Sequence, residues 1–412
     1  MKKTLMALAV GAAFVAPAAL ADVTISGAIN MGILYADSDD RDASAGNSVT
    51  GAVVSSSGGS NYQLTSNYSN LTISSVDDLG GGLKLDFAVQ FHIPLIRASY
   101  GNPGDNVTTN QVANRNSHIG LVSESWGGVW YGTNENLYER YYYTVDPLDG
   151  AAGLGGNLAM LGTPGYGVVF DFGQANCTAA AGCAGFYRRT DETIWYDSPS
   201  FGGLTFGAYI TTTAFKTFGA GGTNPQIMGG GAKWVGQGLP LQVWGAIELH
   251  DDLFGLNAIT GVPGATGSDD QGIQVGVGYT LGDIFMFANY EMLEYESDGL
   301  AAGSVNKYER DALSIGVKWN LASGYVGAQY IQAMEGDCDL QGGGACNAND
   351  SGGKMIGVGY YHTMSKQTQA YIVGHWLDND DLADFRPAIF APPNTGPGVD
   401  FLGISIGLKH SF

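Results

Sequence analysis

The sequence predicts an all-β fold, a transmembrane antiparallel β-barrel of about 16 strands. Three observations lead to it. The 412-residue chain begins with a segment that has the features of an export signal, and its later segments alternate apolar and polar side chains with a period of two. Only 14% of residues are charged, 11% are aromatic and 64 are glycines, which is unusual for a soluble enzyme. A barrel strand that meets lipid on one face and water on the other produces this pattern.

The first 21 residues have the features of a secretory signal peptide. Two lysines precede the apolar stretch 5–16, and Ala19-Leu20-Ala21 offers a small-x-small cleavage site. An N-terminal membrane anchor is the alternative, but the apolar stretch is short for a span of roughly 20 residues. We therefore expect residues 1–21 to be removed and residues 22–412 to form one barrel domain.

The alternation is clearest after the turn sequence at 77–82. Residues 83–92 place Leu, Leu, Phe, Val and Phe on one face and Lys, Asp, Ala, Gln and His on the other. A helix does not keep this period, and a strand does. Because the pattern recurs to the end of the chain, it favours a barrel over a soluble sandwich. Further strands are expected around residues 23–35, 204–210, 273–279, 313–319 and 402–412.

Connections of two sizes separate the expected strands. An outer-membrane barrel has short turns at its periplasmic rim and long loops at its extracellular rim, with an even number of strands. The short connections lie at 77–82, 125–128, 198–203, 236–240, 281–283, 320–324 and 364–367. The long ones, rich in Gly, Asp, Asn and Pro, include 37–60, 250–271 and 378–398.

One connection is much longer than the others. Between Thr133 and Thr190 no alternating segment is long enough to cross a membrane. Its tyrosine-rich start at residues 138–143 argues against simple disorder, and loops of this length are often functional. From composition alone, the segment folds either inward, where it narrows the lumen, or outward as a lid.

The four cysteines form two local pairs, Cys177 with Cys183 and Cys338 with Cys346. In an exported chain such pairs favour disulfides that pin surface loops. A metal site would need a second short-spaced cysteine pair or nearby histidines, so we expect no metal and no cofactor. The formal net charge of −21 argues against nucleic acid as a partner.

Enzymatic activity is not expected either. The sequence holds no His-x-x-x-His ligand pair. Asp251 and Asp252 adjoin His250 and suggest an acid–base group, but they begin a long loop, where acids usually lie in solvent.

Several segments, taken in order, resemble the Gram-negative general porins, especially the trimeric type of proteobacteria. They are residues 22–27, 77–84, 114–121, 196–201 and 407–412. The resemblance covers essentially the whole mature chain. It implies a homotrimer of 16-stranded barrels in the outer membrane, in contact with lipid and lipopolysaccharide. It also implies that the third external loop, 134–189, folds into the lumen as a constriction, and that the barrel-assembly machinery reads a last strand ending in Phe412.

The resemblance further implies a water-filled channel for passive diffusion of ions and small hydrophilic solutes. In such porins acids on the inward loop face a ladder of bases on the wall. Family members often carry arginine where this chain has Asn70 and Thr133, so the ladder looks thinned and we expect cation preference. The expected pore-lining and constriction residues are Lys84, Arg115, Glu135, Glu139, Asp146, Asp149, Asp171 and Arg189.

Some of these positions can be refined from the pattern. Lys84 follows a short turn, so it belongs to the periplasmic vestibule. Arg115 lies either at the constriction or solvated at the mouth. Of the adjacent Arg188 and Arg189 only one faces the lumen, and the alternation favours Arg189. Six tryptophans are expected in the interfacial girdle: Trp130, Trp195, Trp234, Trp244, Trp319 and Trp376.

Two other functions stay open. In a substrate-specific uptake channel, the tyrosines around Arg140 would stack on a sugar or bind a peptide or carboxylate, although a packed loop anchored by tyrosine is commoner. In an adhesive or structural barrel, the disulfide-pinned loops would bind a partner and the lumen would be plugged.

Overall fold

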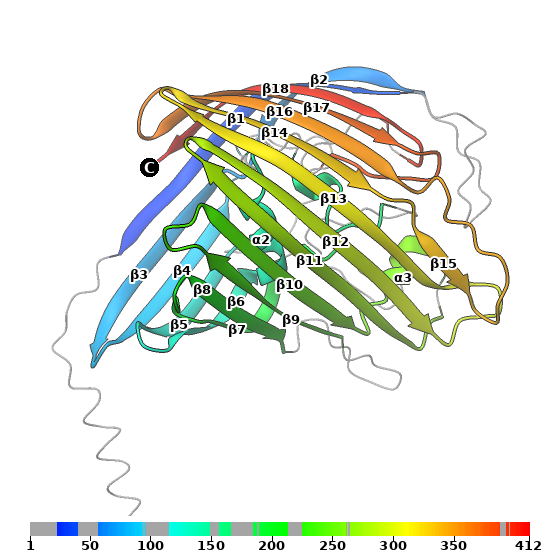
Figure 1. Ribbon diagram of the computed structural model, residues 1–412, viewed down its shortest axis with the longest axis horizontal. Coiled ribbons are helices and arrows are strands. Elements are labelled where there is room, and N and C mark those ends of the chain that lie inside the picture. The colour runs from blue at the N-terminus through cyan, green and yellow to red at the C-terminus, as the bar shows by residue number, and fades with distance from the viewer. Residues whose placement is uncertain are drawn as a thin grey trace, which may run out of the picture.

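In the computed structural model, one antiparallel sheet of 18 strand segments closes into a barrel (Figure 1). The structure describes residues 23–39, 57–93, 95, 115–148, 156–165, 184–187, 189–212, 225–260, 262, 264–387, 393–394 and 396–412. The first nine segments are β1 (Thr24–Ser38), β2 (Gly59–Ser66), β3 (Asn70–Gly80), β4 (Leu83–His92), β5 (Ser117–Ser123), β6 (Gly127–Glu135), β7 (Arg189–Asp197), β8 (Leu204–Thr211) and β9 (Gln226–Val235). The other nine are β10 (Leu241–Asp251), β11 (Gly267–Leu281), β12 (Ile284–Asp298), β13 (Val305–Leu321), β14 (Gly324–Ala333), β15 (Asp337–Leu340), β16 (Gly353–Thr363), β17 (Thr368–Asn379) and β18 (Phe401–Ser411).

Two positions in the wall are each filled by a pair of segments. β2 and β3 pair in succession with β1 and are separated by residues 67–69. β14 and β15 pair in succession with β13 and are separated by residues 334–336. With each pair counted as one interrupted strand, the barrel has 16 strands, which confirms the predicted fold class.

The barrel closes where the first strand meets the last. β1 and β18 pair antiparallel from Ala28 opposite Ser411 to Ser38 opposite Phe401. Phe412 and Gly27 exchange backbone hydrogen bonds of 3.1 Å in both directions. The start of β1 and the C-terminus therefore lie at the same rim of the barrel.

That rim also carries the tight turns. The β11–β12 hairpin turns between the paired residues Leu281 and Ile284, where Gly282 adopts a positive φ of 58°. Glycine tolerates this conformation in a two-residue hairpin turn without steric cost. The β3–β4, β5–β6, β7–β8, β9–β10, β13–β14 and β16–β17 turns lie at the same rim, and the longer connections lie at the opposite one (Figure 1).

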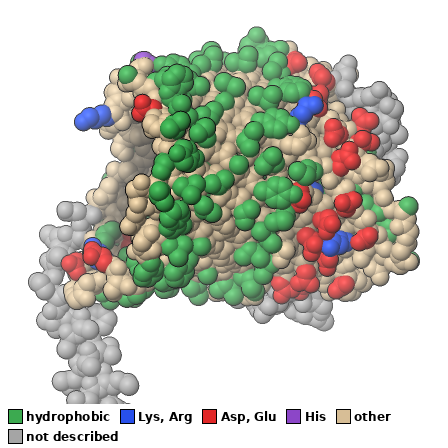
Figure 2. Space-filling view, in the orientation of Figure 1, with side chains coloured by type: hydrophobic (Ala, Val, Ile, Leu, Met, Phe, Trp, Pro, Cys, Tyr) green, Lys and Arg blue, Asp and Glu red, His purple; other side chains and the backbone are tan. Residues whose placement is uncertain are grey.

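The outer face of the wall is apolar. In β18 the outward side chains Leu402, Ile404, Ile406 and Leu408 are 43–59% exposed, while the inward Ser405 is 1% exposed. Figure 2 shows the resulting band of apolar side chains, with acidic side chains gathered beyond it toward the long loops. An exposed apolar band of this kind is the surface that lipid covers. Within the described ranges, no helix is long and apolar enough to cross a membrane.

The buried core lies inside the barrel. Helix α2 (Leu137–Thr144) and the 3-10 turn η2 (Asn157–Ala159) follow β6, and helix α3 (Gly255–Thr260) follows β10. Side chains of the β6–β7 connection, among them Tyr138 and Tyr142, are fully buried with Tyr295 and Tyr308 of the wall. The interior is thus partly filled by a segment of the chain itself.

The girdle prediction is wrong for three of the tryptophans. Trp195 and Trp244 are only 5% and 2% exposed, and Trp130 stacks on Trp195 with ring centroids 5.9 Å apart. The indole N–H groups of Trp130 and Trp244 donate to polar side chains of the wall. A buried indole needs such a partner, and the interior supplies it. Trp319 and Trp376 are 50% and 37% exposed on the outer face.

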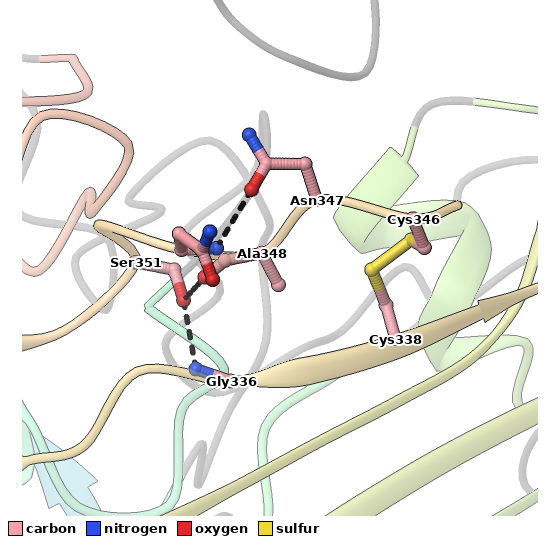
Figure 3. Close-up of a disulfide and its surroundings, with 7 residues drawn as sticks. Gly336, Cys338, Cys346, Asn347, Ala348 and Ser351 are labelled. Carbon is pink, nitrogen blue, oxygen red and sulfur yellow. Dashed lines mark hydrogen bonds between the residues drawn. A yellow bond between two sulfur atoms is a disulfide. The ribbon is translucent and has the colours of Figure 1, made fainter.

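A disulfide ties one long connection to the wall. Cys338 of β15 is bonded to Cys346 in the loop that leads to β16 (Figure 3). Beside it, Gly336 N donates to Ser351 Oγ at 2.9 Å, and Ser351 Oγ donates to Ala348 O at 2.5 Å. Cys177 and Cys183 lie outside the described residues.

Candidate pore constriction

The described part of the β6–β7 connection lies inside the barrel. Its helix α2 begins at Leu137, after Asn136 caps it by accepting a hydrogen bond of 2.7 Å from Glu139 N. The helix lies against the inner face of β8–β10, and Tyr138 O accepts from Gln274 of β11 at 2.7 Å. Because α2 is short, this burial rather than intrinsic helix propensity stabilises it.

A buried ion pair holds the later part of this connection. Glu291 of β12 and Arg310 of β13 lie 3.1 Å apart, and neither side chain is exposed. Arg310 donates to the carbonyl oxygens of Met160 and Thr163 at 2.8 Å each. Glu291 accepts from Gly162 N at 2.9 Å. Buried charges need such partners, since an unpaired one would be costly.

The same carboxylate also binds α2. Glu291 accepts from Tyr138 Oη at 3.2 Å and from Tyr142 Oη. One wall side chain therefore holds two parts of the inward connection, and the tyrosines of α2 serve as anchors.

A second carboxylate, Glu248 of β10, holds the start of the connection. It accepts from Asn136 Nδ2 and from Tyr209 Oη, and its Oε1 lies 2.7 Å from His250 Nε2. The His250 ring stacks on Phe186 with centroids 4.3 Å apart. Phe186 lies near the far end of the connection, so both ends dock on the same stretch of wall.

Two predicted constriction arginines lie near the start of the connection. Arg189 forms an ion pair with Glu135 and donates from Nε to Asn116 Oδ1 at 3.0 Å. Arg115 donates from Nε to Gln90 Oε1 at 3.2 Å, and its guanidinium lies 5.3 Å from the centre of the Tyr68 ring.

The interruption between β2 and β3 puts Tyr68 in this position. Tyr68 has a positive φ of 51°, so the chain leaves the strand there and resumes at Asn70. Burial, and after it the positive charge of Arg189, lowers the pKa of Arg115. An arginine stays protonated at neutral pH even so, which leaves two cations side by side at this point of the interior.

Glu139 differs from its acidic neighbours. It is 3% exposed and accepts from Tyr143 Oη at 3.0 Å. Burial, and after it the negative charge of Glu135, raises the pKa of Glu139 to about 7. This carboxyl group of α2 therefore changes its protonation state near neutral pH.

Arg140 of α2 binds a carboxylate of the barrel wall directly. Its Nη1 and Nη2 donate to the two carboxylate oxygens of Asp197 at 3.0 Å each. Asp197 is the last residue of β7, at the rim of the tight turns. The pair fixes α2 to the wall. Arg140 therefore belongs to a packed loop, as in the alternative to a sugar-stacking site given above.

Of the remaining predicted site residues, Lys84 lies apart from this cluster. Lys84 is at the rim, where Nζ lies 3.9 Å from Glu124 Oε1 and the Glu124 side chain is 95% exposed. Asp146 accepts from Leu148 N at 2.9 Å, shortly after α2. Asp149, Asp171 and Arg188 lie outside the described residues.

The interior anchors were not predicted from the sequence. Glu248 and Glu291 lie between outward apolar residues in their strands, so a charged residue on the interior side of a strand was the available signal. Arg310 lies between Glu309 and Asp311, which hides this signal in β13. In the described ranges, no group of three or more His, Cys, Asp and Glu residues could hold a metal ion. Residues 403–407 match Gly-x-Ser-x-Gly, but they run along β18, and a nucleophile elbow needs a strand-to-helix turn.

An apolar-coated, closed antiparallel barrel with a segment docked inside it is the architecture of an outer-membrane channel. The profile of the Gram-negative porin family matches residues 7–382. The chain belongs to this family, so it is an integral outer-membrane channel protein and not an enzyme.

Individual relatives are more distant. An outer membrane porin protein of Bordetella pertussis is 30% identical over 217 residues, which are 50% of this chain and 47% of that protein. The outer membrane porin protein 32 of Delftia acidovorans is 26% identical over the full length of both chains. The solved structure of an anion-selective porin from Comamonas acidovorans superposes with a TM-score of 0.68 at 20% identity, covering 95% of this chain and 100% of that one. At this identity the superposition concerns the fold.

Proposed function

We propose that this porin is a passive diffusion channel for ions and small hydrophilic solutes, and that it assembles as a homotrimer. The observation that carries the first part is the docking of α2 by Glu291, Glu248 and Arg140. A segment held against one side of the wall narrows a barrel without requiring a partner to open it. The trimer, the contact with lipopolysaccharide and the reading of Phe412 during assembly rest on the family resemblance.

Substrate-specific uptake has less support. A stacking site for sugars needs exposed aromatic faces, and Tyr138 and Tyr142 are 0% exposed because they pack and bond with Glu291. Arg140, the charged group among them, is engaged by Asp197. We therefore propose diffusion without a sugar-stacking site on α2.

The sequence predicts cation preference because acids of the inward connection outnumber the bases. Among the described residues these acids are engaged: Glu135 pairs with Arg189, and the buried Glu139 accepts from Tyr143. Arg115, in contrast, donates to the neutral Gln90. We therefore propose that the constriction has only a weak charge preference.

The test is single-channel conductance of the purified protein in a planar bilayer under a salt gradient. We expect open channels with a reversal potential near zero and no saturable block by neutral sugars. A strongly cation-directed potential would restore the original expectation of cation preference. Saturable block by one sugar would favour specific uptake. A silent bilayer with correctly folded protein would favour the adhesive barrel.

A further inference from the structure

Four lysines lie close to the rim of the tight turns, on strands distributed around the barrel. Lys84 is the second residue of β4, and Lys233, Lys318 and Lys409 lie within the last four residues of β9, β13 and β18. All four strand ends belong to the rim where the C-terminus lies.

Lys233 and Lys318 point into the barrel. Lys233 shares its face of β9 with Gly231, where an added Cβ would lie 2.8 Å from the Tyr141 ring of α2. Lys318 Nζ lies 4.0 Å from the centre of the Tyr325 ring. Tyr325 is 7% exposed and stacks on Tyr361 in the interior.

Lys84 and Lys409 share the interior face of their strands. On β4, Asp86 lies two residues beyond Lys84 and accepts from the inward Trp130 at 2.8 Å. On β18, Ser405 is 1% exposed on the same side as Lys409. Side chains two residues apart on a strand point the same way, so both lysines face inward.

The four lysines form a collar around the wall. In the strand order of the barrel, β4, β9, β13 and β18 are three to five positions apart when the interrupted strands count once. No two of these lysines are on neighbouring strands, so their charges surround the opening.

Two interior carboxylates near this collar, Asp197 and Asp86, are bound by other side chains. Asp197 is engaged by Arg140 at 3.0 Å, and Asp86 by Trp130 and His118. Glu124 approaches Lys84 only to 3.9 Å and is 95% exposed, so water screens that pair. Asp78 lies opposite Lys84 in the β3–β4 register and is exposed, so water screens that pair as well, and Asp77 and Asp283 lie in or beside the turns.

Acidic side chains gather at the opposite end of the barrel, near the long loops. There the outer face of β12, β13 and β15 carries a group of acids around Lys307 (Figure 2). Its acidic members are Glu294, Glu296, Glu309, Asp337 and Asp339. The outer face at the long-loop end is therefore acidic, whereas lysines line the interior at the tight-turn end.

We propose that Lys84, Lys233, Lys318 and Lys409 form a binding collar for small anions with two or more charges at the tight-turn mouth of the channel. Rings of lysine side chains attract anions in pores, and low-dielectric walls focus their field. This inference rests on the proposed channel function, because it needs an open path to the collar.

The test adds inorganic pyrophosphate to one chamber of a planar bilayer that holds single channels in about 0.1 M KCl, where the Debye length is about 10 Å. Each channel should be blocked from one chamber only. The double substitution Lys233→Gln with Lys318→Gln should raise the half-blocking concentration about tenfold, and about 1 M KCl should largely abolish the block.

Lys307→Gln is the matched control, because Lys307 lies on the same strand as Lys318 but on the outer face. It should leave the block unchanged. Equal block from both chambers, or a double variant that blocks like the parent, would overturn the collar while the channel stands. A folded protein without conductance would instead overturn the proposed channel and the collar with it. Heat-dependent gel mobility shows that each variant is folded.

Discussion

β12 and β13 carry ion pairs on both of their faces. Both sets join carboxylates to cationic side chains, but they differ in burial and in the groups around them. On the inner face Glu291 and Arg310 lie 3.1 Å apart with side chains 0% exposed. On the outer face Lys307 lies 2.9–3.3 Å from three glutamates, Glu294, Glu296 and Glu309, with side chains 28–48% exposed.

The difference shows that burial and neighbours decide what an ion pair does. The outer group faces solvent, where water and salt replace any partner that is lost, so an exposed pair contributes about 0–1 kcal/mol. The inner pair binds the backbone of residues 160–163, and no water is available to replace either charge. Removing one partner of a buried pair typically costs about 3–5 kcal/mol.

Breaking the inner pair should therefore have the largest effect. Arg310→Met leaves Glu291 buried without its cationic partner and removes the hydrogen bonds to the backbone oxygens of Met160 and Thr163. We expect a loss of about 3–5 kcal/mol in the free energy of unfolding, measured by urea titration in lipid vesicles. Release of the inward connection should also raise the single-channel conductance.

The double variant Glu291→Gln with Arg310→Met sharpens this result. It removes both charges, so it should be less destabilised than Arg310→Met alone. If the single and double variants lose the same stability, the buried charge of Glu291 is not the cause.

The second-largest effect is expected from pH, which should change how stably α2 is held inside the barrel. The pKa of Glu139 is raised from 4.5 to about 7, so burial favours its neutral form. The stabilisation is therefore complete below about pH 4.5 and is lost as the pH rises through about 7. The loss is on the order of 1–3 kcal/mol. Channels should show more current fluctuation at pH 8 than at pH 5.

Glu139→Gln is the control for this effect. The amide cannot ionise, so the fluctuation should become independent of pH over this range. A parent channel with the same noise at both pH values would contradict the titration of Glu139 inside the barrel.

The ion pair between Arg140 and Asp197 is more exposed than the inner pair, and its geometry is more regular than that of the outer group. Its side chains are 33% and 29% exposed, and two parallel hydrogen bonds of 3.0 Å join them. We expect Arg140→Gln to cost about 1 kcal/mol of unfolding free energy. A double-mutant cycle with Asp197→Asn should give a coupling energy of that size, and zero coupling would show that α2 docks without this pair.

The smallest effect is expected on the outer face. Lys307→Gln removes three exposed contacts and should change the free energy of unfolding by less than about 1 kcal/mol. The change should shrink further when the salt concentration is raised, because the charges are exposed. A loss of stability as large as that of Arg310→Met would mean that exposure does not explain the difference between the inner and outer ion pairs.

Much of the fold could be predicted because its signals are local. The alternation in residues 83–92 and 402–412 predicted strands that the structure has as β4 and β18. The tryptophans show the limit of this reasoning. Trp130, Trp195 and Trp244 were assigned by residue type, although alternation within their own strands places them inward.

The site was predictable only in part. Glu135 and Arg189 were named as candidates, and the structure brings them together across β6 and β7. Glu291 and Arg310 were missed because their importance depends on Met160, Gly162 and Thr163, which lie 129–150 residues away in the chain. Such a long-range contact leaves no periodic pattern in either segment.

By itself the sequence determined which side of each strand faces lipid, where the chain turns and that the barrel is even-numbered. These properties follow from a two-residue period and from glycine-rich turns, which are both local. Only the tertiary structure decided which interior charges are paired and which face the lumen. That depends on where α2 and residues 156–165 dock on the wall, because the same carboxylate is buried and engaged beneath the docked segment and would be solvated without it.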